Sequence, residues 1–591
     1  MPPRRPARSR RAAWLGVLAL AMAGVAAPAQ AQNAVERHLP PAPPPAPPAL
    51  TIGPQGAAKA SAAPLGVMLR GVRLIGAAAK ATAHPPPGLS GTAPGLAPAA
   101  VGDALAPFLG RPLSLKLAQD VQAAIARLYR AAGTPFVSVT LPPQEITSGV
   151  LQVRIVRFRL GKIAIKGAGP GGGGAVARGL RTTPGAPIDA RALEEDLDWL
   201  NRTPYRRVEG VFAPGEATGL SNLTLDVTPS KPWSVLAGWS NTGSRATGLD
   251  RFFVGGGAWL PALNGTTLSY QLTGSADFWQ DPGNGLTLQG DGFPNYLSHA
   301  GRIVIPTWPR QDLEIVPDFV ATHQALDPFT TIENTVFELP VIYRSAISNI
   351  LPGAYWGDLY GGVEFKTLRR STYFANARIA GGQAALFQFV LGWSDRISDD
   401  WGLTTIDARI KADPGGIIAG NDDATWRTFT NGRVNHLGYA YGAVDLTRIT
   451  RLPARFSWVS RLSLLMADQP LPDTERLSLG GFDATRSYFF DDASVDRGLV
   501  WRNELRLPTL SPFAAFIKRA DSLSPYLFAD LGYGQDLATH ATVSLASAGI
   551  GFDYSVGTNV SAGVAAGCAL QSAGATKAGD WTVQSSVTVQ F

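Results

Sequence analysis

The sequence predicts an antiparallel transmembrane β-barrel, expected to have 16 strands, that follows two small α/β modules. Three observations predict this fold class: an export signal, short segments that alternate apolar and polar residues from Trp233 to Phe591, and an uneven distribution of aromatic residues. Of the 53 aromatic residues, only eight precede residue 230. Aromatic side chains concentrate at membrane interfaces, so this distribution places the membrane part in residues 230–591.

Residues 1–31 are expected to be a signal peptide. Five arginines precede an apolar run, Ala12–Ala27, and Ala29-Gln30-Ala31 fits the small-x-small cleavage pattern. A single membrane anchor is the alternative, although the run is short for a spanning helix. Because residues 1–31 contain no acid, the five arginines supply most of the net charge of +7 and leave +2 for residues 32–591. The basic pI therefore does not indicate a nucleic-acid partner.

Residues 32–64 are rich in Pro and Ala, with PPAPPPAPPA at 40–49. Such a run favours extended polyproline conformation and cannot form a core, so it predicts a semi-rigid linker. A ligand for a proline-binding domain is the alternative. The segment before it, Gln32–Leu39, could form a short plug helix.

Residues 65–157 and 158–229 predict two modules, each with the order strand, helix, strand, strand. Ser114 and Asp189 are expected to be helix N-caps, because each offers a side-chain oxygen to the first-turn N–H groups. Apolar residues recur at intervals of three or four after each cap, and alternating segments follow each helix. Each module is therefore expected to have its own small core.

Two irregular stretches interrupt these modules. Ala77–Pro98 is rich in Ala, Pro and Gly and is expected to be a disordered loop or a loosely attached decoration of the module. Gly167–Gly174 is Gly-rich, but no Lys-Ser/Thr follows it, so a flexible connection is favoured over a phosphate-binding loop.

Residues 230–591 alternate as strands of a closed membrane barrel do, with one face for lipid and the other for the lumen. A soluble β-sandwich would also alternate, and the export signal and aromatic content favour the membrane. At about 9–11 residues a strand, this span accommodates roughly 14–18 strands, an even number. The last residues are expected to form an outward-facing barrel-assembly signal that the barrel-insertion machinery reads. One face of this strand carries Trp581, Val583, Val587, Val589 and Phe591. The signal itself is expected to consist of Trp581, Val587, Val589 and Phe591.

The sequence lacks the motifs of catalysis and metal binding. Its six histidines are scattered, and its one cysteine, Cys568, excludes an internal disulfide and a paired-Cys zinc site. Asp491-Asp492 is expected to lie in a solvated loop, with an acidic site as the alternative. No enzyme activity, metal or cofactor is therefore expected.

Several stretches, taken in order, resemble the outer-membrane transporters of two-partner secretion, the TpsB family that includes ShlB, FhaC and HecB. The resemblance identifies the two modules as periplasmic POTRA (polypeptide-transport-associated) domains. The stretches that carry it are ITSGVLQVRIV at 146–156, NRTP at 201–204, LSLGG at 477–481, WRNEL at 501–505 and PYLFADLG at 525–532.

The same resemblance implies the residues of a transport site. The family carries a Val-Arg-Gly-Phe/Tyr loop that folds into the barrel, and this chain has Arg486, Ser487 and Tyr488 there. By resemblance Arg486 pairs with Asp530 on an inner-wall strand that also carries Phe528 and Gly532. A surface-loop cation is the alternative reading of Arg486. Ser487 replaces the family's Gly, which has a cost if that position needs a positive φ.

The resemblance implies export of an unfolded TpsA-like exoprotein from the periplasm across the outer membrane of a Gram-negative bacterium. Outer-membrane lipid and the barrel-insertion machinery are the other expected partners, and nucleic acid is not one. A BamA- or TamA-like assembly factor is the alternative within the superfamily. A passive porin and an outer-membrane hydrolase are the alternatives from other classes.

Overall fold

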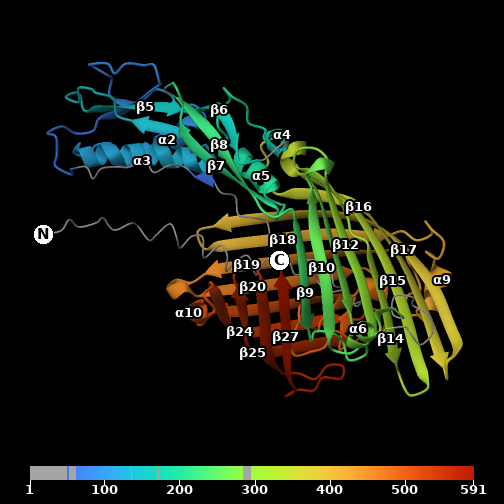
Figure 1. The fold of residues 1–591 in the computed structure, drawn as a ribbon. Helices are drawn as coiled ribbons and strands as arrows, with labels where there is room; N and C mark the ends of the chain where they lie inside the picture. The colour runs from blue at the N-terminus through green and yellow to red at the C-terminus, as the bar shows by residue number, and fades with distance from the viewer. Residues whose placement is uncertain (1–49, 52–60, 135, 169–171, 218, 284–293) are drawn as a thin grey trace. The chain divides into compact units, whose positions relative to one another are not determined.

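The computed structural model describes residues 50–51, 61–134, 136–168, 172–217, 219–283 and 294–591 (Figure 1). They fall into two compact units that divide between Ser230 and Lys231. The expected signal peptide and plug helix, and most of the Pro-rich linker, lie outside the described residues. Within the described ranges, none of the helices combines the length and the apolar character needed to cross a membrane.

The first module is a four-stranded sheet with two α-helices and a short 3₁₀ helix. The predicted cap forms, since Ser114 Oγ accepts a hydrogen bond from Leu117 N at 3.0 Å. The core lies between the sheet and the long helix, with Val121, Ile125 and Val153 fully buried. The sheet order is β3 (Gly88–Ser90), β2 (Gly71–Ile75), β5 (Val150–Arg157) and β4 (Val137–Thr140), and the helices are α2 (Pro98–Leu105), η1 (Ala106–Phe108) and α3 (Leu115–Ala131).

The expectation of a disordered loop at Ala77–Pro98 is wrong for part of that stretch. Gly88–Ser90 forms the edge strand β3, which pairs in parallel with β2. The fully buried Gln152 side chain holds the preceding turn, because it accepts from Thr82 N at 3.0 Å and donates to Thr82 O at 2.7 Å. A buried amide must be hydrogen-bonded, so it fixes the segment that satisfies it.

The second module repeats the plan and also pairs with a piece of the linker. Asp189 Oδ1 caps its helix by accepting from the backbone N–H groups of Arg191 and Ala192, as predicted. Part of the Gly-rich stretch expected to be a flexible connection is helical, because α4 begins at Gly172. The sheet order is β1 (Leu50–Thr51), β7 (Arg206–Pro214), β8 (Leu220–Pro229) and β6 (Arg159–Lys166), and the helices are α4 (Gly172–Gly179) and α5 (Ala190–Leu200).

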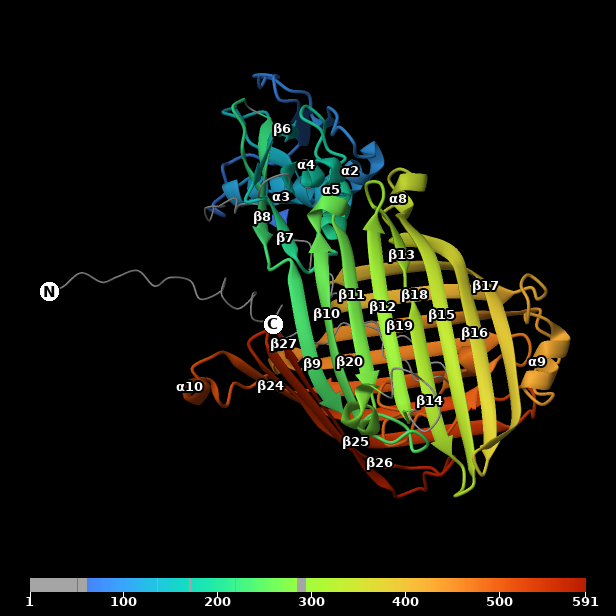
Figure 2. The same ribbon diagram turned by 45° about the vertical axis from the view of Figure 1, so that its right-hand side comes forward.

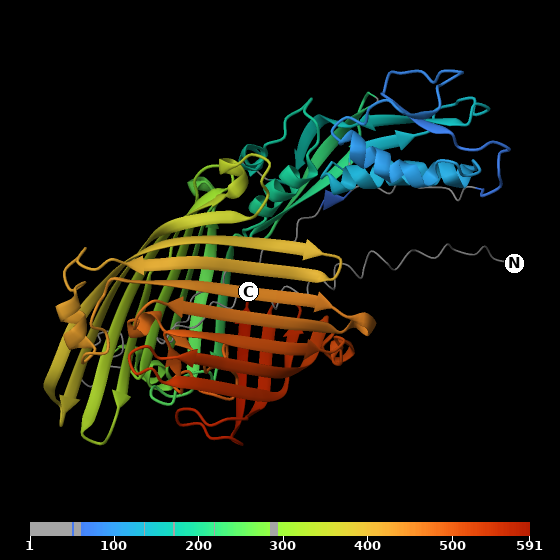
Figure 3. The ribbon, with the colours of Figure 1, turned by 180° about the vertical axis from the view of Figure 1, so that it is seen from behind.

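The second unit is a closed antiparallel barrel (Figures 2 and 3). The last strand pairs with the first and closes it. Two short segments, β13 and β14, both lie between β12 and β15 and form one strand interrupted at Val316 and Pro317, so the described residues give the predicted 16 strand positions. The segments are β9 (Trp233–Ser240), β10 (Arg251–Leu260), β11 (Thr266–Gly274), β12 (Tyr296–Pro306), β13 (Gln311–Ile315), β14 (Asp318–Ala325), β15 (Thr330–Ala346), β16 (Asp358–Phe374), β17 (Ala377–Asp399), β18 (Gly402–Asp413), β19 (Tyr439–Arg451), β20 (Ser457–Ala467), β23 (Arg497–Arg506), β24 (Asp521–Gln535), β25 (Thr542–Val556), β26 (Val560–Ala569) and β27 (Trp581–Gln590).

The barrel strands alternate between an exposed outer face and a buried inner face. In β24, Leu527 and Leu531 are exposed, whereas Phe528 and Asp530 are buried. Apolar side chains on the outer face suit a lipid environment, and polar side chains can line the lumen. The inner face of β24 therefore carries Asp530 into the lumen.

The connection between β20 and β23, residues 468–496, folds into the barrel, and we call it the lumen loop. It contains a short helical turn, η5 (Asp473–Glu475), and a two-stranded ribbon of β21 (Leu477–Ser478) and β22 (Ser494–Val495). Leu477, Leu479 and Tyr488 are buried with inward-facing residues of the wall. The other short elements are η2 (Pro261–Leu263), α6 (Ala276–Gln280), α8 (Ile347–Ile350), α9 (Asp423–Phe429), η4 (Pro453–Arg455) and α10 (Ala514–Ile517).

Candidate functional site

Arg486 at the tip of the lumen loop binds Asp530 on the inner wall. Its Nε lies 2.7 Å from Asp530 Oδ2 and its Nη2 lies 2.7 Å from Oδ1, and the Arg486 backbone N–H also donates to Oδ2 at 3.2 Å. The Arg486 side chain is 1% exposed and that of Asp530 is 0%. A two-point contact between a guanidinium and a carboxylate fixes orientation as well as distance, so it holds the tip against β24.

Glu504 on β23 completes this site, and sequence reasoning missed it. Arg486 Nη1 donates to Glu504 Oε1 at 2.9 Å, and Glu504 also accepts from Arg461 at 3.2 Å and from Arg506 at 2.7 Å. The Arg486 guanidinium stacks 3.9 Å from the ring centroid of Phe528, the aromatic residue expected beside it. The alternation of WRNEL places Glu504 inward, and this pattern could have identified it.

Ser487 adopts the left-handed conformation that favours glycine. Its φ is +75°, and within the described residues its buried Oγ has no hydrogen-bond partner. Its carbonyl accepts from Thr582 Oγ1 on β27 at 3.2 Å. This backbone turn lets Arg486 point to Asp530 on β24 while the Ser487 side chain points to Gly567 on β26. The substitution of Gly by Ser therefore leaves both a strained backbone and an unsatisfied hydroxyl.

Tyr488 and Gly532 fit the tip to the wall. The fully buried Tyr488 donates its hydroxyl to the carbonyl groups of Ala546 at 2.9 Å and Gln571 at 2.8 Å. A Cβ on Gly532 would lie 2.8 Å from Thr485 Oγ1, so only a residue without a side chain lets the loop approach this closely.

The start of the lumen loop is held by a second cluster, which sequence reasoning also missed. Lys366 Nζ lies 2.5 Å from Glu475 of the loop, 2.6 Å from Glu364 and 3.5 Å from Glu338, and all four side chains are at most 5% exposed. Tyr441 donates its hydroxyl to Glu475 Oε2 at 2.8 Å. Three carboxylates match the three N–H donors of an ammonium group, which makes this a well-satisfied buried anchor on β15, β16 and β19.

The end of the lumen loop is held by Asp496, whose side chain is fully buried. Its carboxylate accepts from Arg433 Nη2 at 2.9 and 3.0 Å and from the backbone N–H groups of Leu471 and Leu537 at 2.9 and 2.7 Å. The loop is thus fixed near both ends and at its tip.

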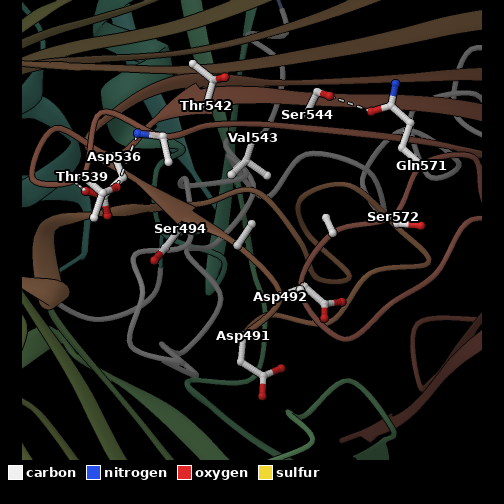
Figure 4. Close-up of a pocket in the computed structure, with 14 residues that line it drawn as sticks. Asp491, Asp492, Ser494, Asp536, Thr539, Thr542, Val543, Ser544, Gln571 and Ser572 are labelled. Atoms are coloured by element: carbon white, nitrogen blue, oxygen red, sulfur yellow. Dashed lines mark hydrogen bonds between the residues drawn. The ribbon is translucent and has the colours of Figure 1, made fainter.

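Asp491-Asp492 was expected to lie in a solvated loop, and for Asp492 this expectation is wrong. The Asp492 side chain is 1% exposed and accepts from Arg245 Nη1 at 2.9 Å and Thr576 Oγ1 at 2.6 Å. Both acids line an open hollow of about 710 Å³ with Asp536 (Figure 4). Among the described residues no group of three or more His, Cys, Asp or Glu side chains is placed to hold a metal.

Comparison with known proteins adds independent observations. Residues 358–554 match the family model described as haemolysin secretion/activation protein ShlB/FhaC/HecB, and residues 92–157 match the ShlB-type POTRA domain. The chain carries the domains of the ShlB/FhaC/HecB family. The family resemblance stated from the sequence is thereby confirmed, and the assignment of residues 158–229 as a second POTRA domain stays a prediction.

Individual relatives of this ShlB-type chain are distant. It is 28% identical over 153 residues to the outer membrane transporter CdiB-2 of Burkholderia pseudomallei, an alignment that covers 25% of each chain. It is 26% identical over 179 residues to CdiB of Escherichia coli, covering 30% of this chain and 28% of the relative. These alignments span roughly a quarter of the length of the curated relatives.

Solved structures share the fold over nearly the whole chain. CdiB from Escherichia coli matches with a TM-score of 0.67 at 17% identity, covering 98% of this chain and 97% of that one. CdiB from Acinetobacter baumannii matches with a TM-score of 0.55 at 14% identity, covering 89% and 90%. The chain is a β-barrel protein, and with the outer membrane transporters named above this fold implies the outer membrane of a Gram-negative bacterium.

The residues expected to form the barrel-assembly signal lie on the outer face of β27. Trp581, Val587 and Phe591 are 70%, 40% and 61% exposed, and Val589 is half-buried. Phe591 still pairs with the first strand, because its backbone N–H donates to Val235 O at 2.9 Å. Recognition of this strand by insertion machinery stays a prediction.

Proposed function

We propose that this chain is the translocation pore of a two-partner secretion system. Its POTRA domains would capture an unfolded TpsA-like exoprotein in the periplasm, and its barrel would export it. The observation that carries the proposal is the lumen loop, bound by Arg486 to the inner wall of a closed barrel. A transporter is also what the family domains indicate, so we assign no enzyme activity.

The lumen loop gives the pore a closed resting state. Its tip, start and end are each bound to the wall by buried ion pairs, and its apolar residues join the largest buried cluster of the barrel. An extended chain needs space that the docked loop occupies. Export therefore requires displacement of the loop, and the ion pairs determine the free energy that this displacement needs.

The free sheet edges of the two modules suit capture of an extended chain. Strand addition uses backbone hydrogen bonds, so it tolerates many cargo sequences. In the described residues, β4 and β6 are edge strands, whereas the edge of β7 is covered by β1. Folding of the exoprotein outside the cell would supply the direction of transport.

A reversible disulfide tests the proposal. A Cβ on Gly567 would lie 2.5 Å from Ser487 Oγ, so cysteines at these two positions are within disulfide reach. In a Cys568→Ala background, S487C/G567C should assemble in the outer membrane, block release of a co-expressed TpsA-like exoprotein when oxidised, and secrete it again after reduction. Each single cysteine variant is the matched control.

Each result separates the proposal from its alternatives. Normal secretion by the oxidised double variant contradicts a pore that opens by loop displacement. Ion conductance without any secreted partner would identify a porin instead. Loss of other outer-membrane proteins when this chain is deleted would identify an assembly factor.

A further inference from the structure

Arg502 lies inside the Arg486 site but makes none of its hydrogen bonds. Its side chain points into the lumen from β23 and is 8% exposed. Its Nη1 lies 3.8 Å from Asp483 and its Nη2 lies 3.9 Å from Glu504, which are too long for hydrogen bonds. In the part of the chain that the structure describes, its Nε has no hydrogen-bond partner. A buried guanidinium in this state is costly, because its Nε donor is desolvated without being matched.

The strand register places Arg502 beside the carboxylate that Arg486 occupies. Arg502 is directly opposite Asp530 in the β23–β24 pairing, and Arg461 is directly opposite Arg502 in the β20–β23 pairing. Directly opposite residues have Cβ atoms about 4.5–5.5 Å apart, within easy reach of an arginine side chain. Yet both oxygens of Asp530 accept from Arg486.

We propose that Arg502 is the replacement cation for Asp530. Arg486 displaces Arg502 from Asp530 when the lumen loop docks, and Arg502 pairs with Asp530 when the loop leaves. The inner wall then keeps a cation beside Asp530 in both states. Without such a replacement, undocking would leave a carboxylate in the wall with no cation opposite it, and this would oppose release. The link to export rests on the proposed function, whereas the exchange of partners does not.

If this exchange of partners occurs, removing Arg502 should stabilise the docked loop relative to the undocked loop. The reporter is T485C in a Cys568→Ala background: Thr485 is fully buried, and among the described residues its Oγ1 has no hydrogen-bond partner, so the thiol breaks no bond. A small water-soluble thiol reagent then measures how often the tip undocks. Because a charge-assisted hydrogen bond to Asp530 is lost only from the undocked state, R502Q should lower the labelling rate about tenfold.

Three variants separate the exchange from a merely structural role. R502K keeps the charge and should label at the parent rate. In a D530N background R502Q should change the rate less than about twofold, because the effects of two residues that act on each other do not add. R409Q is the matched control, since Arg409 on β18 is fully paired with Asp407 at 2.9 Å and Asp445 at 2.8 Å, and it should not alter the rate.

Labelling of R502Q at the parent rate or faster overturns the exchange, because an arginine that only stabilises the wall would loosen the tip when removed. R502M is made in parallel, so that failure of one variant to assemble leaves the other to decide. If R502Q slows labelling but the disulfide-locked loop still permits secretion, the proposed function fails and the exchange stands. If the lock blocks secretion but R502Q labels unchanged, the exchange alone fails.

Discussion

Ser487→Gly should bind the lumen loop more tightly. An L-residue in the left-handed region costs about 1–2 kcal/mol, and the greater freedom of a glycine in the undocked loop returns about 0.5–1 kcal/mol of this. The backbone gain is therefore about 0.5–1 kcal/mol. Within the described residues the buried Ser487 Oγ has no partner, and removing an unsatisfied hydroxyl is worth at least about 1 kcal/mol. Together the docked state should gain about 2 kcal/mol.

The assay is the labelling rate of the T485C thiol in the Cys568→Ala background. A gain of about 2 kcal/mol lowers the undocked population about thirtyfold. Ser487→Ala is the matched control, because it removes the hydroxyl and keeps the strained φ, so its labelling should slow by the hydroxyl contribution alone. Faster labelling of the glycine variant than of the alanine variant would refute the backbone argument. Equal labelling of the glycine variant and the parent would refute both the backbone and the hydroxyl contributions.

Three further predictions concern the same loop. Gly532→Ala should lower the melting temperature of the chain that keeps its native Thr485, since the added Cβ would meet the Thr485 side chain at 2.8 Å. Arg486→Ala leaves the fully buried Asp530 without its bonded cation; heat-modifiability gels should show an assembled but less stable barrel, and culture supernatants should show less secretion. Asp536, in the turn after β24, has a lowered pKa because hydrogen bonds from Thr539 N–H and the positive charge of Arg476 outweigh burial. Its contribution is present above the usual aspartate pKa. The labelling rate is divided at each pH by that of a fully exposed cysteine, which removes the titration of the thiol itself; this ratio should stay constant from pH 8 to about 5 and rise only in stronger acid.

Locally encoded features could be predicted from the sequence. The caps at Ser114 and Asp189 form because an N-cap needs only a side-chain oxygen within two or three residues of the N–H groups it accepts from. The strand faces follow for the same reason, since alternation fixes inward and outward positions within each strand. For Phe528 and Asp530 the family resemblance named the inner-wall strand, and the alternation of buried and exposed residues along β24 agrees with it.

Contacts set by barrel closure could not be predicted in this way. Lys366 and Glu475 are 109 residues apart and meet only because the loop start reaches the wall at β16. Asp492 is buried because Arg245, 247 residues earlier, covers it. A pair of adjacent aspartates typically lies in solvent, so local pattern gave the wrong environment. Resemblance supplied the pairing of Arg486 because that pairing is a property of the family's loop.

The anchors at the start and at the tip of the lumen loop differ in what remains on the wall after the loop departs. At the loop start, Glu338 and Glu364 still neutralise Lys366 once Glu475 leaves, so this wall keeps a satisfied cation. At the tip the departing group is the cation itself, and Asp530 needs another one.

That asymmetry makes the tip the costlier anchor to release, unless a cation is already in place beside it. Arg502 is such a cation, opposite Asp530 in register and short of hydrogen bonds while the loop is docked. The barrel therefore combines a tight closed state with a wall whose charges can be satisfied when the loop is gone. A pore that must both seal and admit a whole polypeptide needs both properties at the same site.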